Sequence, residues 1–211
     1  MNLFKLIFTF SIFYVSYSQD SINSDFNQII LQEDFNTNND IFPTESSNDN
    51  FFGIVNGEYF INRSTDSPYS IMMNWENDLI DFAFTTSIKI SPEKTNSPQS
   101  VGIILKYNPD NQEGLLFEIN SSKKYRLTHI RKNSSKYLSI GKDGWAKSSQ
   151  LYKNGEENKI TIQAKDNRYN IFINDQNVLN TNLSNRASQL NFGKFGIYLS
   201  SFTKAKISYI Y

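Results

Sequence analysis

The most constraining feature of this sequence is a series of short alternating segments in its C-terminal quarter. Ile160, Ile162 and Ala164 alternate with polar residues, which is the two-residue period of a strand that is buried on one face. Asp166-Asn167-Arg168 and Asn174-Asp175-Gln176-Asn177 then interrupt the pattern. Asn and Asp favour turns because their short side chains bond the local backbone. The segment therefore predicts hairpins in an antiparallel sheet.

Earlier parts of the chain show the same kind of pattern. In the clearest case, Phe82, Phe84, Thr86, Ile88 and Ile90 fall on one side of a predicted strand. Many short strands at this spacing predict a sandwich or a barrel, and we expect an all-β, two-sheet antiparallel β-sandwich, a jelly roll. The earlier strands are expected over 29–35, 52–61, 69–74, 79–90, 101–107, 115–119 and 125–132, with a long surface loop over 36–50 and a connection over 91–100.

The beginning of the chain has the form of an export signal. Lys5 precedes the apolar run from Leu6 to Val15, and Ser16-Tyr17-Ser18 offers small residues at the positions that a signal peptidase recognises. We expect a cleavable signal peptide over 1–18 and a single domain over 19–211, with a retained N-terminal anchor as the alternative. The protein is then secreted, periplasmic or exposed on the cell surface, with no membrane span after signal cleavage.

Composition excludes several classes of function. The sequence has no cysteine, which excludes disulfide bonds, thiol catalysis and the acylated cysteine of a lipoprotein. Its 17 Phe and 12 Tyr supply large apolar side chains that suit strands. Lys and Arg together number 21, as do Asp and Glu, so the overall charge is not that of a nucleic-acid binder. We expect no nucleic-acid partner.

Short motifs spread over most of the chain follow the order seen in one β-sandwich superfamily. They are Glu33-Asp34-Phe35, Gly57-Glu58-Tyr59, Asp81-Phe82, Val101-Gly102-Ile103-Ile104, Tyr125-Arg126-Leu127, Trp145, 158–162, 169–174 and 193–198. Together they resemble the concanavalin A-like lectin/glucanase superfamily, and the last three are similar to laminin-G-like and bacterial jelly-roll domains. The resemblance implies that the last strand, Ala205 to Tyr211, pairs beside Leu31 to Phe35. Such motifs mark strands and turns, so they indicate a fold and not a reaction.

One acidic segment resembles a catalytic signature of the same superfold. Glu76-Asn77-Asp78-Leu79-Ile80-Asp81 is similar to the Glu-x-Asp-x-x-Glu pattern of glycoside hydrolases. That resemblance implies that Glu76, Asp78 and Asp81 share one face of a strand, with a retaining pair about 5 Å apart. Here Asp81 is one methylene shorter, and the segment precedes the strongest alternating strand. We expect a solvated acidic turn, and we keep a glycoside hydrolase as the enzymatic alternative.

Metal chemistry has little support in the sequence. His129 is the only histidine, and without cysteine it leaves only carboxylates to complete a zinc shell. Calcium suits an exported jelly roll better, because it binds loop carboxylates and carbonyls. Asp110 and Glu113, in the loop over 108–114, would supply such oxygens, but the EF-hand spacing is absent. We expect a polar hairpin loop and no cofactor, with calcium as the alternative.

Aromatic residues are the remaining candidates for a site. Sugar rings have apolar faces that stack on Trp or Tyr, while Asn, Asp and Arg bind the hydroxyl groups. An aromatic residue in a domain of this composition often packs in the core, so only a contiguous exposed group of them has meaning. The candidate ligand-binding residues are Trp75, Tyr107, Tyr125, Tyr137 and Trp145, with Arg126 and Asn120 as polar neighbours.

These observations favour an exported, non-catalytic carbohydrate-binding or adhesion module, whose partner is a carbohydrate or glycoconjugate. A glycoside hydrolase that uses Glu76, Asp78 and Asp81 is the second hypothesis. A module that binds another envelope or surface protein through a strand edge or loops is the third. The enzyme requires three carboxylates on the concave face, the lectin requires exposed aromatic residues there, and the protein-binding module requires an apolar patch elsewhere.

Overall fold

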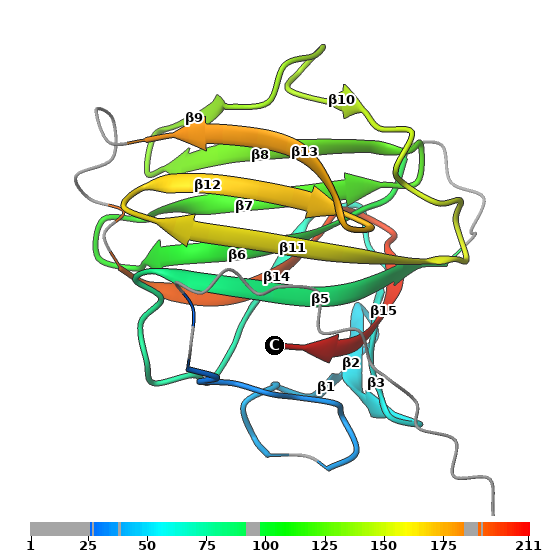
Figure 1. Cartoon of the computed structure of the whole chain (residues 1–211). Coiled ribbons are helices and arrows are strands. Elements are labelled where there is room, and N and C mark those ends of the chain that lie inside the picture. Colours follow the sequence, from blue (N-terminus) through cyan, green and yellow to red (C-terminus); the bar gives the residue numbers. More distant parts are fainter. Residues whose placement is uncertain (1–25, 27, 38, 92–97, 184–189, 191) are drawn as a thin grey trace, which may run out of the picture.

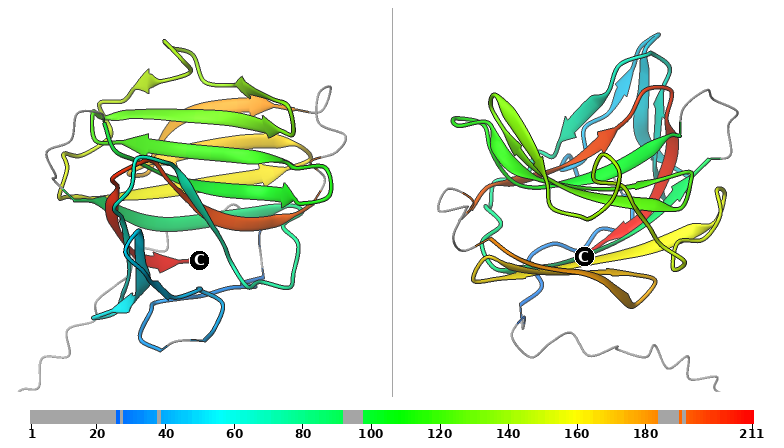
Figure 2. Two further views of the ribbon diagram at one scale, coloured as in Figure 1. Left: turned by 180° about the vertical axis from the view of Figure 1, so that it is seen from behind. Right: turned by 90° about the horizontal axis from the view of Figure 1, so that it is seen from above.

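The computed structural model of the protein describes residues 26, 28–37, 39–91, 98–183, 190 and 192–211. Its strands pair antiparallel and form two sheets that lie one on the other (Figure 1; Figure 2). The predicted two-sheet β-sandwich is therefore confirmed. These ranges contain no helix, and hence none that is long and apolar enough to span a membrane. The expected signal peptide lies outside the described residues.

Sheet A contains eight strands in the spatial order β1-β2-β3-β15-β5-β11-β12-β13. The C-terminal strand β15 lies inside this sheet, where it joins the hairpin of β2 and β3 to the other strands. The strands are β1 (Glu45–Ser46), β2 (Asn50–Val55), β3 (Glu58–Arg63), β5 (Phe82–Ile90), β11 (Glu157–Lys165), β12 (Arg168–Ile173), β13 (Gln176–Asn182) and β15 (Lys204–Ile210).

Sheet B contains seven strands, six of them in the order β10-β8-β7-β6-β14-β4. The short strands β9 and β10 both pair with β8, at different ends of it, and they lie together at the top of Figure 1. The strands are β4 (Tyr69–Met72), β6 (Ser100–Asn108), β7 (Glu113–Asn120), β8 (Lys124–Arg131), β9 (Ser134–Tyr137), β10 (Ala146–Lys147) and β14 (Lys194–Leu199).

The hydrophobic core lies between the two sheets and follows from the alternation in the sequence. Ile160, Ile162 and Ala164 of β11 are all 0% exposed, as the two-residue period predicts. On β5 the same period buries the predicted side, from Phe82 to Ile90. Thr86 is the polar member of that side, and its hydroxyl donates to the carbonyl oxygen of Tyr209 at 2.8 Å. The buried hydroxyl is thus hydrogen-bonded, which removes most of its desolvation cost.

The single strand predicted over 52–61 is wrong, because this segment is the hairpin of β2 and β3. Asn56 and Gly57 form its turn with φ angles of 54° and 74°. Two positive φ angles define the turn that best joins twisted antiparallel strands, and Asn-Gly favours it. By contrast, the predicted turns at Asp166-Asn167 and Asn174-Asp175 are confirmed, again with positive φ angles.

The strand predicted over 29–35 is also wrong. Glu33 forms one isolated antiparallel bridge with Ile210, and Phe35 then takes a positive φ of 58°. The Phe35 amide donates to Oε1 of Glu33 at 2.6 Å, which closes a turn. The implied pairing of the last strand with the first is therefore limited to that bridge, and β15 pairs mainly with β3 and β5.

Candidate functional site

A row of four residues crosses the outer face of sheet B, the face that points away from the core. Tyr198 on β14 lies opposite Gly102 on β6, Gly102 lies opposite Glu118 on β7, and Glu118 lies opposite Arg126 on β8. Directly opposite residues of antiparallel strands share a face. The residues on either side of each of these four belong to the core. We call Tyr198, Gly102, Glu118 and Arg126 the central row.

Gly102 gives the central row its shape. A Cβ atom at this position would lie 2.6 Å from Cδ1 of Leu116, 2.8 Å from the carbonyl oxygen of Phe117 and 2.9 Å from Cγ of Glu118. No side chain fits there, so the side chains of Leu116 and Glu118 extend over the bare backbone of β6. This close packing buries a carboxylate at a position that faces outward.

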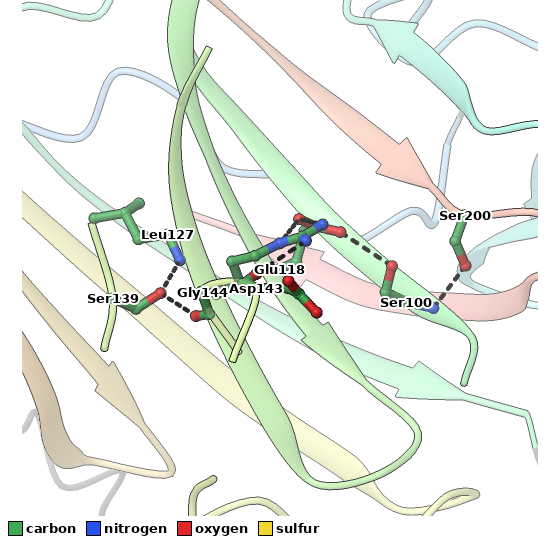
Figure 3. A network of polar contacts seen from close by, with 8 residues as sticks. Ser100, Glu118, Leu127, Ser139, Asp143, Gly144 and Ser200 are labelled. Atoms are coloured by element: carbon green, nitrogen blue, oxygen red, sulfur yellow. Dashed lines mark hydrogen bonds and ion pairs between the residues drawn. The ribbon is translucent and has the colours of Figure 1, made fainter. Parts of the chain in front are cut away.

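Glu118 and Arg126 form an ion pair with two hydrogen bonds. Nε and Nη2 of Arg126 donate to Oε2 of Glu118 at 2.8 and 2.7 Å, and the Ser100 hydroxyl donates to Oε1 at 3.1 Å (Figure 3). The Glu118 side chain is 0% exposed and the Arg126 side chain is 18% exposed. Burial raises the pKa of the Glu118 carboxyl group, while Arg126 and Ser100 oppose this shift. The bonds hold both side chains in one geometry.

Two aromatic rings flank the guanidinium group. Cζ of Arg126 lies 4.4 Å from the ring centroid of Trp145 and 5.2 Å from that of Tyr137. Both distances are within the range of cation–π attraction. Trp145 is partly exposed, and Tyr137 is 47% exposed. The face therefore presents the partly exposed guanidinium of Arg126, fixed by a buried carboxylate, beside a partly exposed ring and an exposed one.

The loop that carries Trp145 is tied to β8 by Ser139. Its hydroxyl accepts a hydrogen bond from the Leu127 amide at 2.9 Å and donates one to the carbonyl oxygen of Gly144 at 2.6 Å (Figure 3). Gly144 has a φ of 77°, and a Cβ there would lie 2.6 Å from the Tyr137 ring. Only glycine meets both conditions, since it tolerates positive φ and has no side chain. The loop is thus held against the face.

Tyr198 completes the central row on the other side of Gly102. Its ring is partly buried. Burial raises the pKa of the Tyr198 hydroxyl, and the negative charge of Glu118 adds to this shift. The hydroxyl therefore stays protonated at neutral pH and can donate a hydrogen bond.

Three of the seven predicted ligand-binding residues come together at this face: Arg126, Tyr137 and Trp145. The other four lie elsewhere or serve the fold. The ring of Tyr125 packs in the core with its centroid 6.1 Å from that of Phe117, and the Trp75 ring centroid lies 6.5 Å from that of Phe195. Tyr107 lies against Gly114 near the end of β6. Oδ1 of Asn120 accepts hydrogen bonds from the amides of Ser122 and Lys124 in the β7–β8 turn.

The acidic segment 76–81 lies in the connection between β4 and β5, on neither sheet face. Glu76 and Asp78 are exposed, and Asp78 pairs with Lys194 at 3.1 Å. Oδ1 of Asp81 accepts the amide of Asp166 at 3.1 Å. The three carboxylates therefore do not share a strand with one another or with the central row.

The predicted calcium ligands lie in the hairpin between β6 and β7. The amide of Asp110 donates to Oδ1 of Asn108 at 2.9 Å, and Glu113 pairs with Arg131 at 3.5 Å. Within the described parts of the chain, no three or more His, Cys, Asp or Glu side chains are grouped so that they could hold a metal ion. The arrangement is that of a polar hairpin with local hydrogen bonds.

Sequence reasoning missed Ser100, Gly102, Glu118 and Tyr198. Glu118 and Gly102 have no local motif, since each alternates with core residues as any outward-facing strand residue does. A usable signal would have been a carboxylate among apolar strand residues, opposite an arginine on the next strand of the chain. That signal requires the register of β7 against β8.

The fold is shared with several solved structures. The carbohydrate-binding module CBM66 from Bacillus subtilis has 14% identity and a TM-score of 0.55, over 70% of this chain and 83% of that one. A Bacteroides ovatus glycoside hydrolase of family 16, from a locus for mixed-linkage glucan, has 11% identity and a TM-score of 0.61. The match covers 87% of this chain and 99% of that one. A Bacillus subtilis protein of unknown function with a galectin-like fold has 9% identity and a TM-score of 0.64, over 86% and 93%.

These likenesses confirm the concanavalin A-like jelly roll and include both binding modules and enzymes. No curated protein matches the chain in sequence. One family model does match it, over residues 31–208, and it describes a 3-keto-alpha-glucoside-1,2-lyase-like domain. The matched region holds the whole central row together with Tyr137 and Trp145. Since that region is most of the sequence, the chain belongs to the family of 3-keto-alpha-glucoside-1,2-lyase-like domains.

Proposed function

We propose that the protein binds carbohydrate, without cleaving it, on the outer face of sheet B. The observation that carries this proposal is the Glu118–Arg126 ion pair held beside the rings of Tyr137 and Trp145. A ring face can pack against the apolar side of a sugar, and a guanidinium group held in one geometry can orient its hydroxyl groups. The fold that the chain shares with CBM66 is consistent with this use of the face.

Binding is favoured over cleavage by the number of carboxylates on the face. Glycoside hydrolysis ordinarily needs two of them, about 5–9.5 Å apart. Among the described strand residues on the outer face of sheet B, Glu118 is the only carboxylate, and it is engaged by Arg126 and Ser100. A buried pair of this kind suits a binding surface that must keep its geometry.

Binding can be tested on a glycan array and by calorimetry with the glycans that it identifies. Tyr137→Ala and Trp145→Ala should each weaken binding at least about tenfold, because each removes a stacking surface beside Arg126. Tyr211→Ala is the matched control, since Tyr211 is 44% exposed and lies at the end of β15 in sheet A. Glycan binding that survives both variants, or no binding across the array, would reject the proposal.

A second candidate is an enzyme of the kind that the family description names, with Glu118 as its acid or base. The observation that favours it is the raised pKa of the Glu118 carboxyl group, since proton-transfer groups are often tuned in this direction. The test is cleavage of a 3-keto-α-glucoside by the protein and by Glu118→Gln. Turnover that the substitution abolishes would establish the enzyme, and no turnover by either protein would leave the binding function.

A further inference from the structure

The positive charge of this protein is concentrated at one place beside the central row. Residues 121–153 carry nine of the 21 Lys and Arg residues of the sequence but only one of its 21 Asp and Glu residues, Asp143. This segment forms the turn before β8, the strands β8, β9 and β10 with the loops between them, and the start of the connection to β11. Arg126 and Arg131 pair with Glu118 and Glu113 of β7, and the segment's other basic residues are seven lysines. A protein with no net charge therefore has a basic edge along β8, β9 and β10, near the top of Figure 1.

Two of these lysines face one another across neighbouring strands. Lys147 on β10 lies directly opposite Lys124 on β8. Lys124 is two residues from Arg126, so both lysines share the outer face of sheet B with the central row. Like charges that are directly opposite destabilise a sheet. The two lysines therefore lower the stability of the folded protein unless a negatively charged group lies against them.

The protein itself does not supply that negative charge in the parts that the structure describes. There, Lys123, Lys124, Lys142 and Lys147 have no ion-pair partner. By contrast, Lys159 is paired with Asp175 and Lys206 is paired with Glu58 on sheet A. Arg126 differs from its basic neighbours, because Glu118 already neutralises it.

From this geometry we infer that the glycan is acidic, a polysaccharide with carboxylate or sulfate groups along its chain. The inference rests on the proposed function and extends it. Tyr137 and Trp145 would contact the sugar rings, and Lys124, Lys147 and the neighbouring Lys123 and Lys142 would attract the acidic groups. The basic edge is continuous with the aromatic rings, so a single extended chain can reach both.

The test compares charged and neutral forms of the same backbone. The purified protein is titrated with polygalacturonate, alginate, hyaluronate and chondroitin sulfate, and with methyl-esterified polygalacturonate as the neutral partner. We expect the acid form to bind at least about tenfold more tightly than the ester. Affinity should also fall between about 50 and about 300 mM NaCl, because added salt shortens the screening length.

The lysine variants separate this inference from the proposed function. Lys124→Gln with Lys147→Gln should weaken binding of the acidic glycan about tenfold, because two exposed ion pairs with the glycan are lost. The unfolding midpoint should stay equal or rise, because two like charges no longer lie opposite one another. Lys89→Gln with Lys159→Gln removes the same charge from the outer face of sheet A and should leave glycan binding unchanged.

Three results would overturn the inference. The first is equal binding of acidic and neutral glycans that still depends on Tyr137 and Trp145, in which case the proposed function stands. The second is no binding of any glycan, in which case both fail. The third is equally tight binding of double-stranded DNA or of vesicles containing phosphatidylserine, which would identify a general polyanion or membrane surface.

Discussion

The outer faces of the two sheets carry ion pairs in opposite settings. On sheet A, Lys206 pairs with Glu58, and the two side chains are 37% and 22% exposed. On sheet B, Arg126 and Glu118 are 18% and 0% exposed. Water screens the charges of the Lys206–Glu58 pair. In the Arg126–Glu118 pair, little water reaches the charges, so each is stabilised mainly by the other. Sheet A should therefore tolerate changes on its outer face, and sheet B should not.

The largest effect is expected when the buried pair loses one member. Arg126→Ala leaves the Glu118 carboxylate buried and unpaired, and it should lower the free energy of unfolding by about 3–5 kcal/mol. Lys206→Ala on sheet A should cost no more than about 1 kcal/mol. Urea denaturation of both variants measures the difference.

A double variant shows whether the stability lost in Arg126→Ala comes from an unpaired buried charge or from lost packing. Glu118→Leu with Arg126→Met removes both charges and keeps much of the volume, so it should recover most of the stability lost in Arg126→Ala. If the double variant is as unstable as the single one, the cost comes from packing around the central row and the electrostatic comparison of the two faces is wrong.

A smaller effect is expected from filling the space above Gly102. Gly102→Ala places a Cβ 2.6 Å from Leu116 and 2.9 Å from Glu118, and such overpacking should cost about 1–3 kcal/mol. Gly53 on sheet A is the matched position, since the closest contact of a Cβ there is 3.6 Å, to Thr44. Gly53→Ala should leave the thermal unfolding midpoint unchanged or slightly higher, and equal losses in the two variants would contradict the close packing of sheet B.

The smallest effect concerns pH and the inner side of β8. His129 is 2% exposed, and burial followed by the charge of Arg131 lowers its pKa. The unfolded chain then takes up a proton at a higher pH than the folded one, so stability present above about pH 6.5 is lost as the pH falls below that value.

This loss cannot exceed about 1.4 kcal/mol per pH unit for one proton. Unfolding free energies between pH 5 and 8 should therefore slope less for His129→Leu than for the unchanged protein. The same slope in both proteins would assign the acid sensitivity to other groups.

Most of the strands could be predicted from the sequence, because apolar residues at every second position indicate a strand that is buried on one face. β11 and β12 follow this rule along their whole lengths, and β5 departs from it only at Ser87, which is buried on the other face. The prediction failed at Asn56-Gly57, where loose alternation continued across a turn, and at Phe35, where a positive φ ends the extended chain. β9 is exposed at every position, so it has no alternation to detect.

The site was harder to predict because it depends on register between distant strands. Arg126, Tyr137 and Trp145 could be chosen by residue type alone. Glu118 and Gly102 become neighbours only through the pairing of β6 with β7. That pairing shifts at an irregularity between Leu105 and Asn108, and the pairing of β14 with β6 shifts between Lys194 and Gly196. No local sequence pattern specifies such shifts.

The Ser139 hydroxyl makes the Trp145 loop part of the hydrogen-bond network of sheet B. Because the Leu127 amide donates to a side chain of that loop, opening the loop also exposes an amide of β8. The Leu127 amide should therefore exchange with solvent deuterium only when the loop opens, so its exchange rate measures how firmly the loop is held. The loop is ordered during folding, so a ligand that docks on it should bind with little loss of conformational entropy and little change in the bound protein's shape.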